Sequence, residues 1–544
     1  MNFATKSVPS RFPQRFLPRA GTLLIILGLA SCVHAPRWNP ETVAPPASLD
    51  EAVTQAKQSV MEKQPDSEAQ AAEAIPLSRD GAILTALNRN RSLAVERYAP
   101  QLSKSRIEDA RAAFDPSLLA TVSYGKSASA AGFSEEDDSG VSVSRSFQGD
   151  VQVSEFLPTG TEVYLSGGLS RSRSGSANWG YSGSWSVGVN QSLLEGAGVD
   201  VNLIDLRQAE NNAAISRHEL RGFVIDLVEQ VEASYWQLVL AKETLEIRRF
   251  SLQLAREQLE LTEDYIQVGK MAQDARVSAE AEVASRQADL VDAEADVKAR
   301  TIDLIRLLNP ERDDQWALTF QTIDSPVVEA VEVAPSVSVR LADQYRPELA
   351  QSRLNLANQD LEVIRTRNGL LPQLDAFASY GRNSSGDSFA GATRSWDDRE
   401  RENYEVGLSF QVAPLNRSEK ASHQRAQFEQ QQAEASVANL EQLLETEVRS
   451  AAVEVQRQWD RIPATQKTVE SRQEELRVEQ ARFKVGKSTN LDVLQVQENL
   501  IQAQLSEVTA RVQYIQALTA LYQAEGTLLE RRGIGVNLEG ESVK

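Results

Sequence analysis

The stretch FKVGKSTNLDVL, residues 483–494, places a Val-Gly-Lys turn between two segments that have the periodicity of long helices. A second copy, YIQVGKMAQDAR, occupies residues 265–276 and also has helical patterns on both sides. Glycine often ends helices because it adopts the left-handed backbone conformation without a steric penalty. Asp274 in one copy, and Asn490 or Asp492 in the other, could cap the outgoing helix. Each copy therefore predicts the tip of an antiparallel helical hairpin.

The helices that flank these tips are predicted to be long. Small or apolar residues recur every three or four positions along 205–268, 277–305, 418–484 and 493–528, a spacing typical of coiled-coil seams. At ~1.5 Å per residue the first run would measure about 96 Å, so it needs lateral partners. Pro463 predicts a kink in the third run.

The chain also repeats itself at long range. Residues 90–125 align without a gap on residues 346–381, and ten of the 36 positions are identical. The identities include Pro116 and Pro372 and a closing Ser-Tyr-Gly. Each copy has the pattern of a helix, a proline break and a strand. We therefore predict two structural repeats, each with strands between its helices.

After each proline, apolar residues alternate with small or polar ones, which predicts strands. Several runs have about ten residues, the length of a tilted strand that crosses a bilayer, and serine and glycine on the opposite face suit a water-filled lumen. A soluble sandwich would show the same alternation. Long loops at 170–180 and 381–402 and a short turn at 156–163 favour a transmembrane barrel. The alternating runs are 118–124, 141–156, 161–172 and 181–193 in the first repeat, and 374–380 and 404–412 in the second.

The N-terminus has the features of a lipoprotein signal. Its apolar segment, residues 20–30, follows four basic residues and is roughly half as long as a spanning helix. It ends in Leu-Ala-Ser-Cys, which resembles the bacterial lipoprotein processing box, with Cys32 as the lipidated residue. Cys32 is the chain's only cysteine, so no disulfide competes for it. Val33 follows, which by resemblance to sorted lipoproteins indicates the outer membrane.

Composition and charge exclude several classes of protein. Among the 544 residues, 41% are hydrophobic and 6% aromatic, and the mean hydropathy is −0.37, which argues against a bundle of membrane helices. The net charge is −20, and removal of residues 1–31, with four basic and no acidic groups, makes it −24. Such a surface repels nucleic acid. His34, His218 and His423 are widely spaced, and no HExxH, GxSxG or phosphate-loop motif occurs, so we expect no enzyme, metal or cofactor.

Taken together, these patterns resemble the TolC family of outer-membrane efflux factors, over about residues 75–530. The motifs that carry the resemblance are LLPQLDAFASYG (370–381), YWQLVLA (235–241), NQSLLEGAG (190–198) and FKVGKSTNLDVLQVQ (483–497). The resemblance implies an α+β membrane protein, a homotrimer whose strands close one transmembrane β-barrel that is continuous with a long periplasmic α-helical coiled-coil barrel.

The resemblance leaves the strand count of the barrel open. The family usually contributes four strands per chain, two from each half. The alternating runs of this chain number four in the first half and two in the second. The extra hairpin, around residues 156–163, either joins the barrel wall or folds elsewhere.

The resemblance also implies two sites at the inner end of the tunnel. The tips are expected to meet the hairpin of a periplasmic adaptor, or membrane fusion, protein. Asp492 matches an acidic constriction that forms a periplasmic gate, whereas the family's second aspartate is Gln495 here. Asp492 could instead serve only as a helix cap. The expected docking residues are Val268, Gly269, Lys270, Val485, Gly486 and Lys487.

The implied function is the outer-membrane channel-tunnel of a tripartite efflux or type I secretion system. It would conduct substrates passively from the adaptor and an inner-membrane pump of RND or ABC type to the exterior. The alternative is a lipid-anchored coiled-coil scaffold or adhesin without channel activity. The expected segments are a signal peptide (1–31), a lipidated tether (32–74), the first repeat (75–308, strands about 117–193, hairpin about 205–308), an equatorial segment (309–340), the second repeat (341–530, strands about 373–413, hairpin about 418–530) and a tail (531–544).

Overall fold

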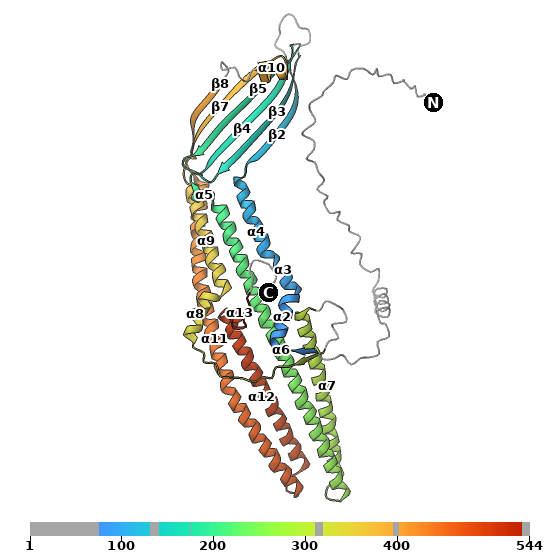
Figure 1. Ribbon diagram of the computed structural model, residues 1–544. Helices are drawn as coiled ribbons and strands as arrows, with labels where there is room; N and C mark the ends of the chain where they lie inside the picture. Colours follow the sequence, from blue (N-terminus) through green and yellow to red (C-terminus); the bar gives the residue numbers. More distant parts are fainter. Residues whose placement is uncertain (1–74, 131–140, 176, 310–318, 395–401, 536–544) are drawn as a thin grey trace, which may run out of the picture. The chain divides into compact units, whose positions relative to one another are not determined.

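The computed structural model describes residues 75–130, 141–175, 177–309, 319–394 and 402–535 (Figure 1). The chain divides into two compact units, residues 1–71 and 72–544. All described residues lie in the second unit. Cys32, the signal peptide and the tether therefore lie outside the described residues, as do positions 536–544 of the expected tail.

Six strands form one sheet in which every neighbouring pair is antiparallel. The order is β2-β3-β4-β5-β7-β8, so the two halves of the chain meet where β5 pairs with β7. Strands β2 and β8 form the two edges. The extra hairpin, β3 and β4, lies inside this sheet. The strands are β2 (Ser117–Ala130), β3 (Val141–Leu157), β4 (Thr161–Ser174), β5 (Gly180–Ser192), β7 (Gln373–Gly386) and β8 (Glu402–Gln411).

The two faces of the sheet differ in chemistry. Side chains alternate between faces along a strand, and directly paired residues share a face. The register therefore places valine, leucine and alanine on one face and mainly serine, glutamine and asparagine on the other. The first set includes Val122, Val151, Val153, Leu165, Val187, Val189, Ala378, Val406 and Leu408; the second includes Ser123, Gln148, Gln152, Ser166, Ser186, Asn190, Ser379 and Ser409.

Four long helices form two antiparallel hairpins. They are α6 (Ile204–Gln267) with α7 (Asp274–Leu308), and α11 (Arg417–Lys484) with α12 (Asn490–Ala524). Figure 1 shows the members of each pair side by side. Helix α11 includes Pro463 and is not interrupted there, although a proline removes one backbone hydrogen bond. Because α6 begins soon after β5 and runs for 64 residues, its tip lies about 96 Å of helix away from its start.

Shorter elements connect the sheet with the hairpins. Helices α4 and α9 precede β2 and β7, so they hold corresponding positions in the two halves. Strands β1 and β6 pair in parallel. These elements are β1 (Ile75–Leu77), α2 (Arg79–Arg89), α3 (Arg91–Glu96), α4 (Tyr98–Arg111), η2 (Ala112–Phe114), α5 (Val199–Asn202), β6 (Phe320–Thr322), α8 (Pro335–Tyr345), α9 (Pro347–Asn368), α10 (Phe389–Arg394) and α13 (Leu528–Arg531).

The main core lies where α6 packs against α2, α12 and α13, and a second cluster joins α8, α11 and α12. Glu232 of α6 is fully buried and accepts two hydrogen bonds from the Arg532 guanidinium, one of them at 2.8 Å. Thr519 also donates to this carboxylate, at 2.9 Å. Because Arg531 is likewise paired, with buried Glu525, the packed fold extends past the residue where we expected the tail to begin.

Candidate functional site

The two Val-Gly-Lys tips have the same backbone geometry. Gly269 follows α6 with a φ of 70°, and Gly486 follows α11 with a φ of 73°. At each tip the glycine and lysine N–H groups donate to carbonyls of the last helical turn, which is the Schellman arrangement. The bonds run from Gly269 to Ile266 (3.0 Å), Lys270 to Tyr265 (2.8 Å), Gly486 to Phe483 (3.0 Å) and Lys487 to Arg482 (2.9 Å).

Each tip presents one exposed valine. Val268 is 66% exposed and Val485 is 68% exposed. A Cβ added to Gly269 or Gly486 would meet no atom within 4 Å, so only the positive φ requires glycine there. The ammonium of Lys270 lies 5.7 Å from the centre of the Tyr265 ring, and Lys487 is exposed. The tips are therefore two similar surfaces, each an apolar side chain beside a lysine.

The helix after the second tip begins with a capping box. Thr489 is the N-cap: its hydroxyl accepts from the Asp492 N–H at 3.3 Å, and the Asp492 carboxylate accepts from the Thr489 N–H at 2.9 Å. The expected caps are thus corrected. Thr489, and not Asp492, is the N-cap residue; Asp492 is the N3 residue of the capping box. Asn490 is the first helical residue. At the first tip the N-cap is Gln273, without a side-chain cap bond, and Asp274 accepts from the Ala275 N–H.

Asp492 is an exposed carboxylate at the tip. Hydrogen bonds from the hydroxyl and the N–H of Thr489 lower the pKa of Asp492, because they stabilise the ionised form. Gln495 is also exposed and donates to Asn499 at 3.4 Å. Asp492 therefore carries a negative charge at neutral pH while it caps the helix, so the two roles considered for it are compatible.

The two hairpins contact each other just behind the tips. The Tyr265 and Phe483 rings lie 5.6 Å apart within a cluster that also contains residues of α12. The Gln258 side chain donates to the Asn490 side chain at 2.7 Å, and Thr262 donates to the same oxygen at 3.4 Å. All three polar side chains are buried. Separation of the tips would therefore expose polar groups that are paired here.

Further from the tips, an ionic network links three helices. Arg286 of α7 pairs with Glu498 of α12 and with Glu282, and it lies 3.8 Å from Asp289. Asp289 also accepts from Arg248 of α6 at 2.9 Å. The Arg286 side chain is only 10% exposed, so this network is screened less by solvent than a surface pair. It fastens one hairpin to the other.

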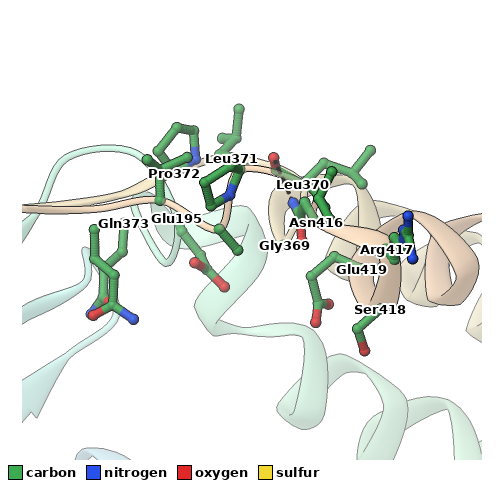
Figure 2. Close-up of a pocket in the computed structure, with 15 residues that line it drawn as sticks. Glu195, Gly369, Leu370, Leu371, Pro372, Gln373, Asn416, Arg417, Ser418 and Glu419 are labelled. Atoms are coloured by element: carbon green, nitrogen blue, oxygen red, sulfur yellow. Dashed lines mark hydrogen bonds between the residues drawn. The ribbon is translucent and has the colours of Figure 1, made fainter.

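A cavity of about 610 Å³ lies where β7 and β8 join the helices. Figure 2 shows Glu195, Gln373 and Glu419 extending to the same side of the connecting backbone. The lining of the cavity also includes the exposed side chains of Leu371 and Leu415. The cavity combines acidic groups with apolar side chains and includes Pro372, but it holds none of the expected docking or gating residues. It therefore adds no candidate for docking or gating.

Within the described residues, no group of three histidine, cysteine, aspartate or glutamate side chains could hold a metal. None of the helices in the described ranges is long and apolar enough to cross a membrane. The sequence reasoning placed both tips and Asp492 but missed three contributors. Thr489 was readable from its Thr-x-x-Asp spacing. The Gln258–Asn490 and Arg286–Glu498 contacts join residues more than 200 positions apart, and no local pattern signals them.

Comparisons with known proteins agree with this architecture. A family model described as "Outer membrane efflux protein" matches residues 148–310 and 339–527. The pyoverdine export outer membrane protein OpmQ of Pseudomonas aeruginosa is 25% identical over 379 residues, which cover 64% of this chain and 73% of OpmQ. Outer membrane protein TolC of Escherichia coli is 29% identical over 205 residues, covering 36% of this chain and 41% of TolC.

Solved structures share the fold at low sequence identity. The CmeC outer membrane channel of Campylobacter jejuni aligns with a TM-score of 0.62 at 14% identity, covering 86% of this chain and 91% of CmeC. VceC of Vibrio cholerae aligns with a TM-score of 0.60 at 17% identity, covering 82% and 96%. The fold and its paired tips thus define an outer-membrane channel-tunnel protein of mixed α and β structure. The chain belongs to the outer membrane efflux protein family, which confirms the resemblance.

Proposed function

We propose that this protein is the outer-membrane channel of a tripartite export system, assembled as a homotrimer. The observation that carries the proposal is the continuity of a two-faced antiparallel sheet with two helical hairpins that end in similar tips. An apolar outer face and a polar inner face are what a membrane barrel needs. The family membership favours this function over the scaffold or adhesin alternative.

Transport through such a channel is passive, and the tips control entry. Val268 and Val485 supply exposed apolar surface for the hairpin of a periplasmic adaptor. Gly269 and Gly486 shape that surface, and Asp492 supplies negative charge at the narrow inner end. Docking of the adaptor would separate the hairpins at the Gln258–Asn490 contact and open the tunnel. Energy for transport comes from the inner-membrane pump and not from this chain.

The proposal also includes a lipid anchor and the classes of cargo. Cys32 would carry the lipid that holds the N-terminus in the outer membrane, and residues 33–74 would span from that lipid to the fold. Relatives are named for pyoverdine export and for protease secretion, so both small molecules and proteins are candidate cargo. The proposed partner is an inner-membrane pump of RND or ABC type.

Conductance tests the proposed function directly. Purified trimers in a planar bilayer should give discrete single-channel currents, small at rest because the tips are closed. Exchange of Val268 and Val485 for aspartate should abolish cross-linking to the co-expressed adaptor without changing the trimer content. Chains that fold and trimerise but never conduct would support the scaffold alternative instead.

A further inference from the structure

The sheet has two open edges, and both have the properties of interfaces. The outer main-chain groups of β2 and β8 have no neighbouring strand among the described residues. Side chains on the apolar face are also most exposed there: Val122 of β2 is 73% exposed and Val406 of β8 is 77% exposed. Interior Val153 and Val189 are 40% and 37% exposed. Each edge strand therefore has a neighbouring strand on one side only, whereas each interior strand has one on both sides.

The inserted hairpin β3–β4 has the same alternation of apolar and polar side chains between the two faces as the rest of the sheet. Its residues pair with β2 and β5 in continuous ladders of 14 and 12 pairs. On the polar face, serine hydroxyls bond across strands: Ser166 with Ser186 and Ser170 with Ser182, both at 2.7 Å. Only a hairpin in the barrel wall has one face towards lipid and the other towards water, and this alternation suits that position.

The turn between β3 and β4 is also fastened to the start of the helical region. The Asn202 side chain donates to three carbonyls: Pro158 at 3.2 Å, Gly196 at 2.9 Å and Gly198 at 3.0 Å. Gly160, with a φ of 82°, packs so closely that a Cβ would lie 2.3 Å from the Gly196 oxygen. The turn is thus built into the junction between sheet and helices and is not a free appendage.

We propose that all six strands of each chain enter the barrel wall, so that three chains close an eighteen-stranded barrel in which β2 of one chain pairs with β8 of the next. This inference rests on the proposed function, in which three chains share one barrel. Six is an even number, so β2 and β8 run in opposite directions and each new junction is antiparallel like the pairs within the chain. The occupant of each open edge is therefore a second copy of this chain.

The consequence is a wide, polar lumen. At a given strand tilt the barrel diameter grows roughly linearly with strand number, so eighteen strands give about 1.5 times the diameter of twelve. Barrels of 16–18 strands leave an aqueous channel. The interior strands line this lumen mainly with hydroxyl and amide groups, including those of Gln152, Ser166 and Asn190. Four acidic side chains lie on the same face: Asp150, Glu162, Asp375 and Glu405. The barrel would therefore admit bulky hydrated cargo through a polar lumen that also carries negative charge.

Cysteine accessibility in the assembled channel tests the placement of the hairpin. In a Cys32→Ser background, Ser166→Cys should react with a charged, membrane-impermeant thiol reagent, whereas Leu165→Cys should not. A fluorophore attached at residue 165 should instead be quenched by brominated lipids. The matched reference pair is Ser379→Cys and Ala378→Cys on β7. Equal reactivity at residues 165 and 166, with the reference pair still alternating, would show that the hairpin lies outside the wall.

Pore size provides the second measurement. Deletion of residues 141–174 removes β3 and β4 and leaves β2 able to pair with β5, which would give a twelve-stranded barrel. The largest polyethylene glycol that enters from the outer side should then fall to about two thirds of its wild-type diameter. An unchanged limit would overturn the inference. The cysteine pairs decide the matter even where the deletion variant does not fold. Absence of current in the wild type would refute the proposed function, whereas current with an unchanged limit would refute only the strand count.

Discussion

At the scale of single residues, the tips depend on two glycines whose only requirement is a positive φ. A Cβ at Gly269 or Gly486 would point into open space, so substitution there tests backbone conformation without a packing change. An L-residue in the left-handed region costs roughly 1–2 kcal/mol, and asparagine tolerates that region better than other residues do.

We expect Gly486→Ala to weaken docking while Gly486→Asn retains most of it. Alanine shifts the tip away from the left-handed turn and moves Val485, whereas asparagine keeps the turn. The measurement is the yield of cross-linking from a cysteine at Lys487 to the co-expressed adaptor, with thermal unfolding of the trimer as control. Equal yields for both variants and the wild type would place the docking surface elsewhere.

Asp492→Asn separates the two roles of this carboxylate. Asparagine still offers an oxygen to Thr489, so the helix start should lose less than about 1 kcal/mol. In the proposed trimer three charges would leave the inner end, so cation selectivity and block by multivalent cations should both decrease.

Thr489→Val is the matched control for Asp492→Asn, because it removes the hydroxyl of the cap but keeps the charge. It should lower stability and leave ion selectivity unchanged in single-channel recordings. Wild-type selectivity in Asp492→Asn would leave Asp492 as a cap alone.

At the residue scale, the sequence predicted where the helix reversals lie better than it predicted which side chains contact each other. The repeated Val-Gly-Lys located both helix reversals, because positive φ is a local requirement that glycine satisfies. Sequence reasoning did not assign the N-cap to Thr489, although a local pattern signals it. Asn490 was seen as a cap candidate but not as the contact of Gln258, since that contact depends on how two distant hairpins pack.

At the scale of elements, alternation predicted the strands well. The run expected at 161–172 corresponds to β4, Thr161–Ser174, because one apolar face and one polar face leave a clear period of two. The order of the strands was not predictable in the same way. Whether β3–β4 joins the sheet between β2 and β5 depends on the pairing of whole strands, to which the turn contact between Asn202 and Pro158, 44 positions apart, is one addition.

We expect the ion pair between the two hairpins, Arg286 with Glu498, to keep the channel closed at rest. Arg286→Ala would leave Glu498 without its ion-pair partner, and loss of a partly buried ion pair should cost about 1–3 kcal/mol. The resting open probability should therefore rise roughly 5- to 150-fold. Arg300→Ala is the matched control, because the Arg300–Asp296 pair lies on the same helix with both side chains well exposed. Single-channel recordings at neutral pH compare the two, and similar resting currents would contradict the role of Arg286.

The same pair predicts a dependence on pH. Burial opposes the ionisation of Glu498, but hydrogen bonds from Gln502 and Arg286 outweigh it and lower the pKa of Glu498 below its usual 4.5. A carboxyl whose pKa is lowered by folding stabilises the closed contact above pH 4.5 and loses that effect as the pH falls through the lowered value. Resting conductance should therefore rise in acid below pH 4.5, and Glu498→Gln should remove that component of the rise. An unchanged acid response in Glu498→Gln would assign it to other groups.

At the scale of the whole molecule, we expect the proposed lipid anchor at Cys32 to be separable from the channel. The described fold packs its core from residue 77 onward, and residues 33–74 separate the described part of the chain from Cys32. Cys32→Ser with a non-lipoprotein signal peptide should therefore still give trimers and single-channel currents. Recovery of monomers alone, measured by size-exclusion chromatography with light scattering, would show that the lipid takes part in assembly.

The even number of strands in each chain limits how a barrel of this kind can change. Neighbouring strands alternate in direction, so an insertion preserves the antiparallel junction between chains only when it adds strands in pairs, as β3 and β4 do. In the proposed trimer, three-fold symmetry would multiply every inserted pair by three. The aperture of such a trimeric pore would then change only in steps of six strands, without intermediate widths. A single duplicated hairpin in one gene would enlarge the opening at once.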